Sequence, residues 1–249
     1  MQEKNVRMGK IYVVGIGPGN EKNMTIRAKE VLDECEIIAG YTAYIDLVRD
    51  RYPKKTFFEN GMRKELQRCR ACVEMAKSGK LVALICSGDA GIYGMASPLL
   101  EVAEQEGFHD VEIIPGVSAA MSGAALLGAP LAHDFCVISL SDLLTPWSKI
   151  ETRLLCAAQG DLCIAIYNPA SHKRPGHLQT ACDILLAVLS PDTCCGYVRN
   201  IGREGSLTKT CRLSELRDLP ADMLTTVYIG NSQTRILNGR LVTPRGYQT

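Results

Sequence analysis

Short apolar runs alternate with amphipathic segments along the chain of 249 residues. In the first half the apolar runs are uninterrupted, as is typical of strands buried on both faces of a parallel sheet. The segments between them carry apolar residues at helical spacing. The predicted strands lie in KIYVVG from Lys10, EIIAG from Glu36, the run that ends at Cys86 and VEII from Val111, and the predicted helices span residues 25–34, 63–77 and 92–105. The basic, turn-rich segment at 53–61 is predicted to be a link.

The second half repeats this alternation. FCVISLS, DLCIAIYNP and TCCGYVRN predict strands, and the helices between them begin near Pro146 and Pro175. Three further segments, LTKTCRL, MLTTVYIGN and RILNGRLV, also read as strands, the last with an Asn-Gly turn. Strands without intervening helices pair in antiparallel fashion, so this half is expected to carry a mixed sheet.

A chain of this length lies near the size at which one hydrophobic core splits into two. The Pro-Gly break at 115–116 separates the two sets of strands and helices. We therefore expect two α/β domains, residues 1–115 and residues 116–249.

The charge balance argues against nucleic acid or an anionic membrane as a partner but leaves local basic patches possible. The chain has 28 basic and 27 acidic residues, which leaves no net field to attract nucleic acid or an anionic membrane. Its apolar runs are shorter than the roughly 18 residues of a spanning helix, and its first ten residues are too polar for a secretion signal. We expect a cytoplasmic protein that acts on a small molecule.

The eleven cysteines are scattered, and most stand inside apolar runs. Cysteine behaves there as a small hydrophobic residue in a reducing compartment. Cys69 and Cys72 form a CxxC, but no second CxxC or nearby histidine completes a metal site. We interpret this pair as core packing and predict no metal.

Glycine-rich loops follow two of the predicted strands. Gly88 and Asp89 lie in SGDAGIY, where small residues let a ligand approach the backbone and a carboxylate can accept hydrogen bonds or pair with an ammonium group. The alternative is a connection in which Asp89 caps a helix. The earlier loop, GIGPGN, lacks the spacing of a dinucleotide or phosphate loop, and Pro18 has no N–H to donate.

Five loops together resemble those of the tetrapyrrole methylases, which use S-adenosylmethionine on corrin precursors and related compounds. They are residues 15–19, 87–94, 115–119, 167–169 and 225–230. HDFCVISLSDLLTPW from His133, GYTAY from Gly40 and GMRKELQR from Gly61 look like the precorrin-3B C17-methyltransferases of cobalamin biosynthesis. In that subgroup, methylation at C17 accompanies expulsion of the C20 carbon and contraction of the ring.

The resemblance implies two α/β domains with the cofactor, S-adenosylmethionine, in the cleft between them, and a homodimer. It places a trough for the macrocycle and part of the cofactor site in the first domain, and the rest of the cofactor site in the second. Ala90 departs from the proline that many relatives carry. The resemblance also implies which residues bind the cofactor. They are Pro18, Gly88, Asp89, Ile92, Ser118, Ala119, Tyr167, Asn168, Arg199, Asn200 and Thr226.

The substrate implied by the resemblance is a tetrapyrrole, precorrin or cobalt-precorrin, whose acetate and propionate arms call for basic side chains. Lys173 is a further basic candidate, whereas Lys64 is interpreted as solvated surface. Tyr41 and Tyr44 could line a pocket or be ordinary, partly buried tyrosines. The substrate-binding candidates are Gly15, Gly17, Tyr41, Tyr44, Arg63 and Arg174.

Ring contraction requires proton movements, so an acid or base is expected near the substrate. The first candidates are His133 and Asp142, and His172 is a less favoured third. His133 would otherwise pair with Asp134 in a loop, and Asp142 would be a turn or cap residue. An unperturbed imidazole both gives and accepts protons near neutral pH, which favours His133.

Three classes of function are compared: a methyltransferase, a nicotinamide oxidoreductase and a tetrapyrrole carrier without enzymatic activity. A nicotinamide oxidoreductase needs a full dinucleotide fingerprint, and a tetrapyrrole carrier needs no cofactor loops. Within the resemblance, the alternative is a precorrin C-methyltransferase that acts at a different ring carbon. The sequence does not distinguish a cobalt-containing substrate from a metal-free one.

Overall fold

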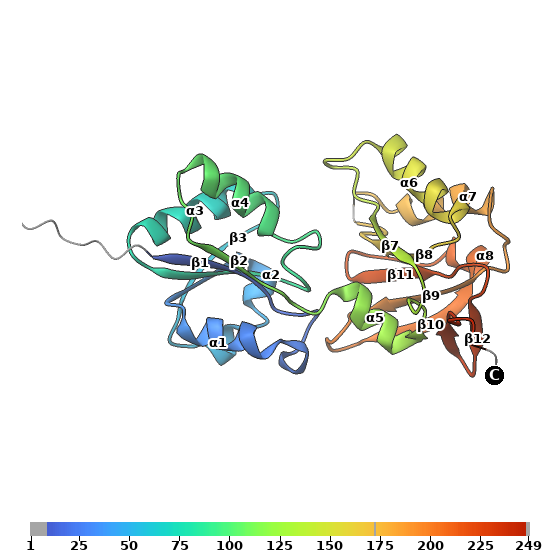
Figure 1. Ribbon diagram of the computed structural model, residues 1–249, viewed down its shortest axis with the longest axis horizontal. Helices are drawn as coiled ribbons and strands as arrows, with labels where there is room; N and C mark the ends of the chain where they lie inside the picture. The colour runs from blue at the N-terminus through green and yellow to red at the C-terminus, as the bar shows by residue number, and fades with distance from the viewer. Residues whose placement is uncertain (1–8, 172, 248–249) are drawn as a thin grey trace, which may run out of the picture. The chain divides into compact units, whose positions relative to one another are not determined.

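The computed structural model describes residues 9–171 and 173–247, which form two compact units, Met1–Ala119 and Ala120–Thr249 (Figure 1). Each unit is organised around one five-stranded sheet. The Pro-Gly break predicted that the boundary between the two domains lies between residues 115 and 116. The short segment between the two positions belongs to the first unit, where the N–H of Gly116 donates to Asp89.

The sheet of the first unit is wholly parallel, with strand order β3-β2-β4-β1-β5. Its strands are β1 (Lys10–Gly15), β2 (Ile37–Tyr41), β3 (Thr56–Asn60), β4 (Leu81–Cys86) and β5 (Val111–Ile114). Its helices are η1 (Glu21–Asn23), α1 (Ile26–Glu34), α2 (Thr42–Ile45), η2 (Arg49–Arg51), α3 (Glu65–Lys77) and α4 (Ala96–Gln105).

Helices cover both faces of this sheet, as the uninterrupted apolar runs predict (Figure 1). In β1, Ile11 and Val13 point to the core under α3 and α4, whereas Tyr12 and Val14 point to the core under α1 and α2. Thr25 starts α1, because its hydroxyl accepts the N–H of Ala28 at 3.1 Å.

The interpretation of residues 53–61 as a link was wrong, because Thr56–Asn60 forms β3. This strand lies at the edge of the sheet and pairs with β2 alone. An edge strand is partly solvated, so TFFEN lacks the continuous apolar run of its neighbours. The helix predicted at 92–105 begins later, at Ala96, since residues 92–95 extend the preceding loop.

The second unit has a mixed sheet of order β10-β9-β11-β8-β7, as predicted. In this sheet β7 and β8 pair in parallel, and the other neighbouring strands pair in antiparallel fashion. The sheet consists of β7 (Phe135–Ser139), β8 (Cys163–Tyr167), β9 (Cys194–Arg199), β10 (Leu207–Arg212) and β11 (Thr225–Ile229). A smaller sheet joins β6 (Gly128–Ala129), β12 (Arg235–Leu237) and β13 (Arg240–Val242), and the Asn-Gly turn links the last two strands.

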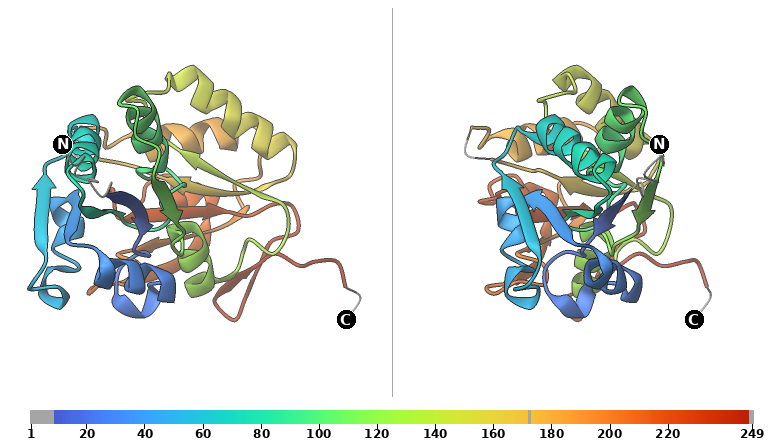
Figure 2. Two further views of the ribbon diagram at one scale, coloured as in Figure 1. Left: turned by 60° about the vertical axis from the view of Figure 1, so that its left-hand side comes forward. Right: turned by 90° about the vertical axis from the view of Figure 1, so that its left-hand side faces the viewer.

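Helices also lie on both faces of the larger sheet. α6 (Trp147–Gln159), α7 (His177–Leu186) and α8 (Leu213–Leu216) share one core with the strands, and Figure 2 shows α6 in yellow and α7 in orange along the same face. α5 (Ala119–Leu127) packs on the other face, where Gly123 lies against the ring of Tyr228. A side chain at Gly123 would collide with that hydroxyl.

The prediction that Cys69 and Cys72 pack in the core is confirmed, since both lie on the inner face of α3 and are fully buried. Burial raises the pKa of the Cys69 thiol to about 11 and that of Cys72 further still. Within residues 9–171 and 173–247, no group of three or more His, Cys, Asp or Glu side chains is arranged to hold a metal ion.

None of the helices in the described part of the chain has both the length and the apolar character needed to cross a bilayer.

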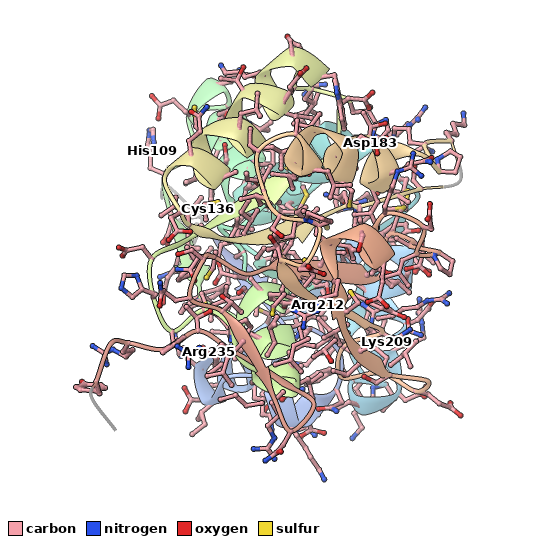
Figure 3. All side chains as sticks on the ribbon, turned by 90° about the vertical axis from the view of Figure 1, so that its right-hand side faces the viewer. His109, Cys136, Asp183, Lys209, Arg212 and Arg235 are labelled. Carbon is pink, nitrogen blue, oxygen red and sulfur yellow. The ribbon has the colours of Figure 1, made fainter. Side chains whose placement is uncertain are left out.

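The burial of the thiols predicts how they react. The thiolate is the nucleophile, so buried thiols of raised pKa are inert. We expect Ellman's reagent at pH 8 to modify exposed Cys156 first and half-buried Cys136 (Figure 3) slowly, and to reach the other nine only after unfolding. Cys156→Ser should abolish the fast phase. Fast modification of a second thiol in that variant would contradict the burial described here.

Candidate functional site

Loops from β1 and β4 join at the carboxyl edge of the first sheet. The N–H of Gly17 donates to the carbonyl of Gly88 at 3.1 Å, and the N–H of Gly88 donates back at 2.7 Å. Both glycines have positive φ, 75° and 72°, a region that costs glycine little and other residues much more. The two glycine-rich loops therefore form one backbone platform, at the edge where open α/β sheets bind ligands.

The loop after β5 packs against this platform, backbone on backbone. An ideal Cβ on Gly15 would lie 2.7 Å from both the nitrogen of Gly116 and the carbonyl oxygen of Gly88. A Cβ on Gly116 would collide with Gly88 and would lie 2.6 Å from the oxygen of Gly15. Three loops thus meet where no side chain fits.

This packing predicts that Gly116→Ala lowers the free energy of unfolding by about 1–3 kcal/mol, the usual range for overpacking. Gly61→Ala is the matched control in the same unit, because a Cβ there meets nothing within 4 Å. It should stay within about 0.5 kcal/mol of the parent in urea titrations. Equal stabilities for the two variants would contradict the close approach.

Asp89 ties the second and third loops together. Its Oδ1 accepts the N–H of Gly91 at 2.8 Å and its Oδ2 accepts the N–H of Gly116 at 2.9 Å. The sequence left two alternatives for Asp89, a contact with a ligand or the cap of a helix. Each alternative assumed that the carboxylate has a single role. Each oxygen keeps a second lone pair, so the side chain can organise the loops and still accept from a ligand.

The other candidates of the first unit differ in exposure. Pro18 and Ser118 are buried, and Ala119 is half-buried at the start of α5. Ile92 is exposed, and its neighbour Tyr93 has a φ of 54°, a strained conformation for a bulky side chain that is often found at functional sites.

Tyr41 and Tyr44 lie together where β2 meets α2, with ring centroids 5.3 Å apart in an edge-to-face arrangement. Arg63 lies in the loop between β3 and α3 and has a φ of 64°. Gly15 is buried against Gly88 and Gly116.

Sequence reasoning missed Arg68, which supports the loop of Arg63. Arg68 is only 3% exposed. Its Nε donates to Asn60 Oδ1 at 2.9 Å, its Nη2 to the carbonyl of Gly61 at 3.3 Å, and its Nη1 lies 3.8 Å from the sulfur of Met95. The buried guanidinium joins the loop after β3 to the loop after β4. The available signal was an arginine on the apolar face of the predicted helix.

In the second unit, the predicted cofactor residues gather at one edge of the sheet. Tyr167 ends β8 and Asn168 follows it, and Arg199 ends β9 and Asn200 follows it. Thr226 belongs to the antiparallel β11, whose first residue pairs with Arg199, so the start of this strand lies at the same edge.

The two asparagines at this edge share an uncommon backbone conformation. Asn168 has a φ of 53° and Asn200 a φ of 54°, in the left-handed region that asparagine tolerates better than most residues. Arg199 forms an ion pair with Asp222 at 2.7 Å. The chain therefore turns sharply after each of these strands, and the turn side chains are presented at the edge.

The phenol of Tyr167 is already engaged by the first turn of α5. Its oxygen accepts the N–H of Ala120 at 2.7 Å, and the hydroxyl of Tyr228 donates to the carbonyl of the same residue at 2.9 Å. Burial raises the pKa of Tyr228, which stays neutral and can donate. Two tyrosines thus fix the start of α5 on the sheet.

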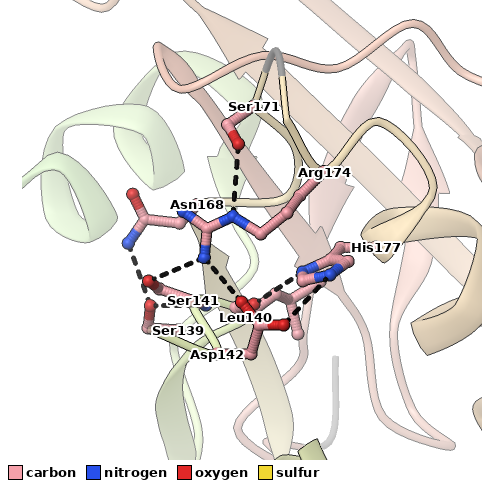
Figure 4. Close-up of polar contacts among 8 residues, drawn as sticks. All are labelled: Ser139, Leu140, Ser141, Asp142, Asn168, Ser171, Arg174 and His177. Carbon is pink, nitrogen blue, oxygen red and sulfur yellow. Dashed lines mark hydrogen bonds and ion pairs between the residues drawn. The ribbon is translucent and has the colours of Figure 1, made fainter. Parts of the chain in front are cut away.

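A polar network brings together three residues to which the sequence analysis gave separate roles (Figure 4). Arg174 Nη1 donates to Asp142 Oδ1 at 2.8 Å and to Ser141 Oγ at 3.1 Å. Asn168 Nδ2 donates to Ser139 Oγ at 2.9 Å. The N–H of Ser141 donates to the same Ser139 hydroxyl at 3.2 Å, which connects the two pairs.

The hydrogen bond from Arg174 holds the pKa of Asp142 below its ordinary value of 3.8, and the neighbouring His177 acts in the same direction. Asp142 is therefore ionised at neutral pH. An ionised carboxylate can accept a proton or anchor a cation, but it cannot act as an acid.

His133 and Asp142 lie at opposite ends of β7 and therefore at opposite edges of the sheet. His133 is half-exposed, and its Nδ1 accepts the N–H of Asp134 at 2.9 Å. It lines an open pocket of about 760 Å³ with Arg235, Arg245 and Tyr247 among others. Asp142 is thus the catalytic candidate that shares an edge with Asn168 and Arg174. His172 lies outside the described residues.

A family model described as tetrapyrrole (corrin/porphyrin) methylases matches residues 10–217. The chain is a tetrapyrrole methylase. This confirms the family that the five loops indicated, and with it an S-adenosylmethionine-dependent C-methyltransferase.

Relatives of this tetrapyrrole methylase carry more specific names. It is 47% identical over 238 residues to a probable cobalt-factor III C(17)-methyltransferase of Salmonella typhimurium, covering 95% of this chain and 99% of that protein. It is 38% identical over 248 residues to a precorrin-3B C(17)-methyltransferase of Sinorhizobium sp., covering 96% and 97%. The crystal structure of the methyltransferase CobJ matches with a TM-score of 0.88 and 36% identity, covering 95% of this methylase and all of that chain.

Proposed function

We propose that the protein transfers a methyl group from S-adenosylmethionine to C17 of cobalt-factor III or precorrin-3B and contracts the ring, a step in the synthesis of the corrin ring of vitamin B12. The observation that carries this proposal is the 47% identity with a protein of that name over 99% of its length. A precorrin C-methyltransferase acting at another ring carbon remains the alternative. The resemblance of the loops supports a homodimer as well, and the shortness of the apolar runs supports a cytoplasmic location.

Methyl transfer from a sulfonium is an in-line displacement, so the protein's task is to hold the methyl donor and the acceptor carbon in line. The residues present fit S-adenosylmethionine. Gly17 and Gly88 adopt the positive φ that joins the two loops, and Asp89 offers acceptors for an ammonium group or ribose hydroxyls. The proposed contacts are Pro18, Gly88, Asp89, Ile92, Ser118 and Ala119 from the first unit, and Tyr167, Asn168, Arg199, Asn200 and Thr226 from the second.

The substrate is a polycarboxylate, and Arg174 is the basic candidate whose setting supports a role in binding it. Its Nη1 and Nε are engaged by Asp142, Ser141 and Ser171. Its Nη2 has no partner among the described residues, so two N–H groups are available for a carboxylate. Gly15, Gly17, Tyr41, Tyr44 and Arg63 stay as proposals from the first unit.

The experiment that tests the function uses purified protein, methyl-labelled S-adenosylmethionine and cobalt-factor III, with precorrin-3B in parallel. We expect calorimetry to show binding of S-adenosylmethionine, and carbon NMR of the product to place the labelled methyl at C17 of a contracted ring. Label at another carbon would favour the alternative methyltransferase. Absence of cofactor binding by folded protein would overturn the proposal.

Two variants separate the candidates for proton transfer during contraction. The position of Asp142 beside Arg174 and its ionised state support it as the base, whereas His133 lies at the other edge of the sheet. General base assistance contributes about 100- to 10,000-fold. In single turnover with saturating substrate, Asp142→Asn should slow contraction by at least about 100-fold, and His133→Ala should contract the ring at the parent rate.

Slow contraction in His133→Ala, with the parent rate in Asp142→Asn, would instead support His133 as the residue that transfers the proton. Calorimetry with S-adenosylmethionine is the control for both variants, since neither change should alter cofactor binding.

A further inference from the structure

Two adjacent leucines stand exposed in the loop between β7 and α6. Leu143 is 53% exposed and Leu144 is 96% exposed, the highest value for a large apolar side chain in residues 9–171 and 173–247. Loops are ordinarily polar, and neither leucine belongs to the core of the second unit. The function proposed above gives no role to this leucine pair, residues 143 and 144.

The loop that carries the leucine pair is anchored at both ends. Before the pair, the N–H of buried Leu140 donates to the carbonyl of Tyr167 at 2.9 Å. After the pair, Trp147 begins α6, and its ring packs on that of His177 with centroids 4.8 Å apart. Anchored ends restrict the conformations of the tip, so less conformational entropy is lost when a ligand covers it.

The leucine pair is also next to the polar network of Arg174 (Figure 4). Asp142, which accepts from Arg174 Nη1 at 2.8 Å, is the residue immediately before Leu143. The N–H groups of Arg174 Nη2 have no partner among the described residues. The same loop therefore presents an apolar tip beside two donors that suit a carboxylate.

These two features together define the chemistry of the ligand. A ligand that covers the leucine pair must present an apolar surface, and one that pairs with Arg174 must carry an anionic group. A small polar anion would satisfy Arg174 but would leave the leucines in water. A tetrapyrrole satisfies both, because its macrocycle is a broad apolar face with acetate and propionate arms at the rim.

We propose that the leucine pair packs on one face of the tetrapyrrole while Arg174 holds a carboxylate arm at its rim. The pair is a binding element and takes no part in methyl or proton transfer. This inference rests on the proposed function for the identity of the ligand, and it deepens that function by assigning the contact with the apolar face of the macrocycle.

Fluorescence measures this contact without turnover. Trp147 is the single tryptophan of the chain and lies three residues after Leu144, so a tetrapyrrole bound at the loop should quench its emission by energy transfer. The probe is cobalt-factor III, titrated in the absence of S-adenosylmethionine. We expect Leu144→Ser to raise the dissociation constant about tenfold, equivalent to about 1.4 kcal/mol, because serine removes most of the apolar area that the macrocycle covers.

Two further variants control for the shape of the loop and for exposed leucines in general. Leu144→Met keeps the apolar character and should stay within twofold of the parent dissociation constant. Leu237→Ser is the matched control, because Leu237 is 52% exposed in β12 of the smaller sheet, and it should keep the parent value. Since all three side chains that change are exposed, each variant should keep the parent urea midpoint and the parent affinity for S-adenosylmethionine.

The outcomes distinguish this contact from the alternatives. Parent affinity for cobalt-factor III in Leu144→Ser, or equal losses in the Ser and Met variants, would overturn it even if the parent methylates C17. A weaker dimer of Leu144→Ser in analytical ultracentrifugation, with unchanged affinity for the macrocycle, would assign the leucine pair to a second copy of the chain instead. A parent whose binding of cobalt-factor III depends on Leu144, but which transfers no methyl group, would refute the proposed function and not the contact.

Discussion

The carboxylate of Asp89 holds the candidate site of the first unit together. Three loops converge on one sheet edge, and their glycine backbones approach too closely for side chains to lie between them. Backbone N–H groups at such a junction must be paired, because an unpaired buried donor costs free energy. Asp89 accepts two of them, from Gly91 and Gly116. The shape of this edge therefore depends on one side chain.

The sheet edge of the second unit is organised in a different way. Its edge is organised by side chains rather than by close backbone contact, with serine hydroxyls, Asn168, Asp142 and Arg174 in one connected network. Such a network allows each group to be oriented by its neighbours. The first unit thus provides a closely packed backbone edge, and the second provides directed polar groups.

Much of the fold could be predicted from the sequence because the parallel strands are apolar on both faces. β3 could not, since an edge strand with polar residues lacks that pattern. For the site, the glycine-rich loops and Asn168 carried clear local signals. Arg68 did not, because its role depends on Asn60, which helix packing brings close. The sequence already places His133 before β7 and Asp142 after it. The length of this strand separates the two side chains.

The place of β1 between β4 and β5 has a consequence for how the chain folds. β1 pairs with β4, where Lys10 meets Leu81, and with β5, where Ile11 meets Val111. Ribosomes release the chain from its amino end, so the first strand emerges long before either partner. Its apolar residues remain without their sheet until β5 has emerged, and such late, non-local pairing folds slowly and leaves strand edges open to aggregation. The first unit is therefore the part of the nascent chain most in need of protection.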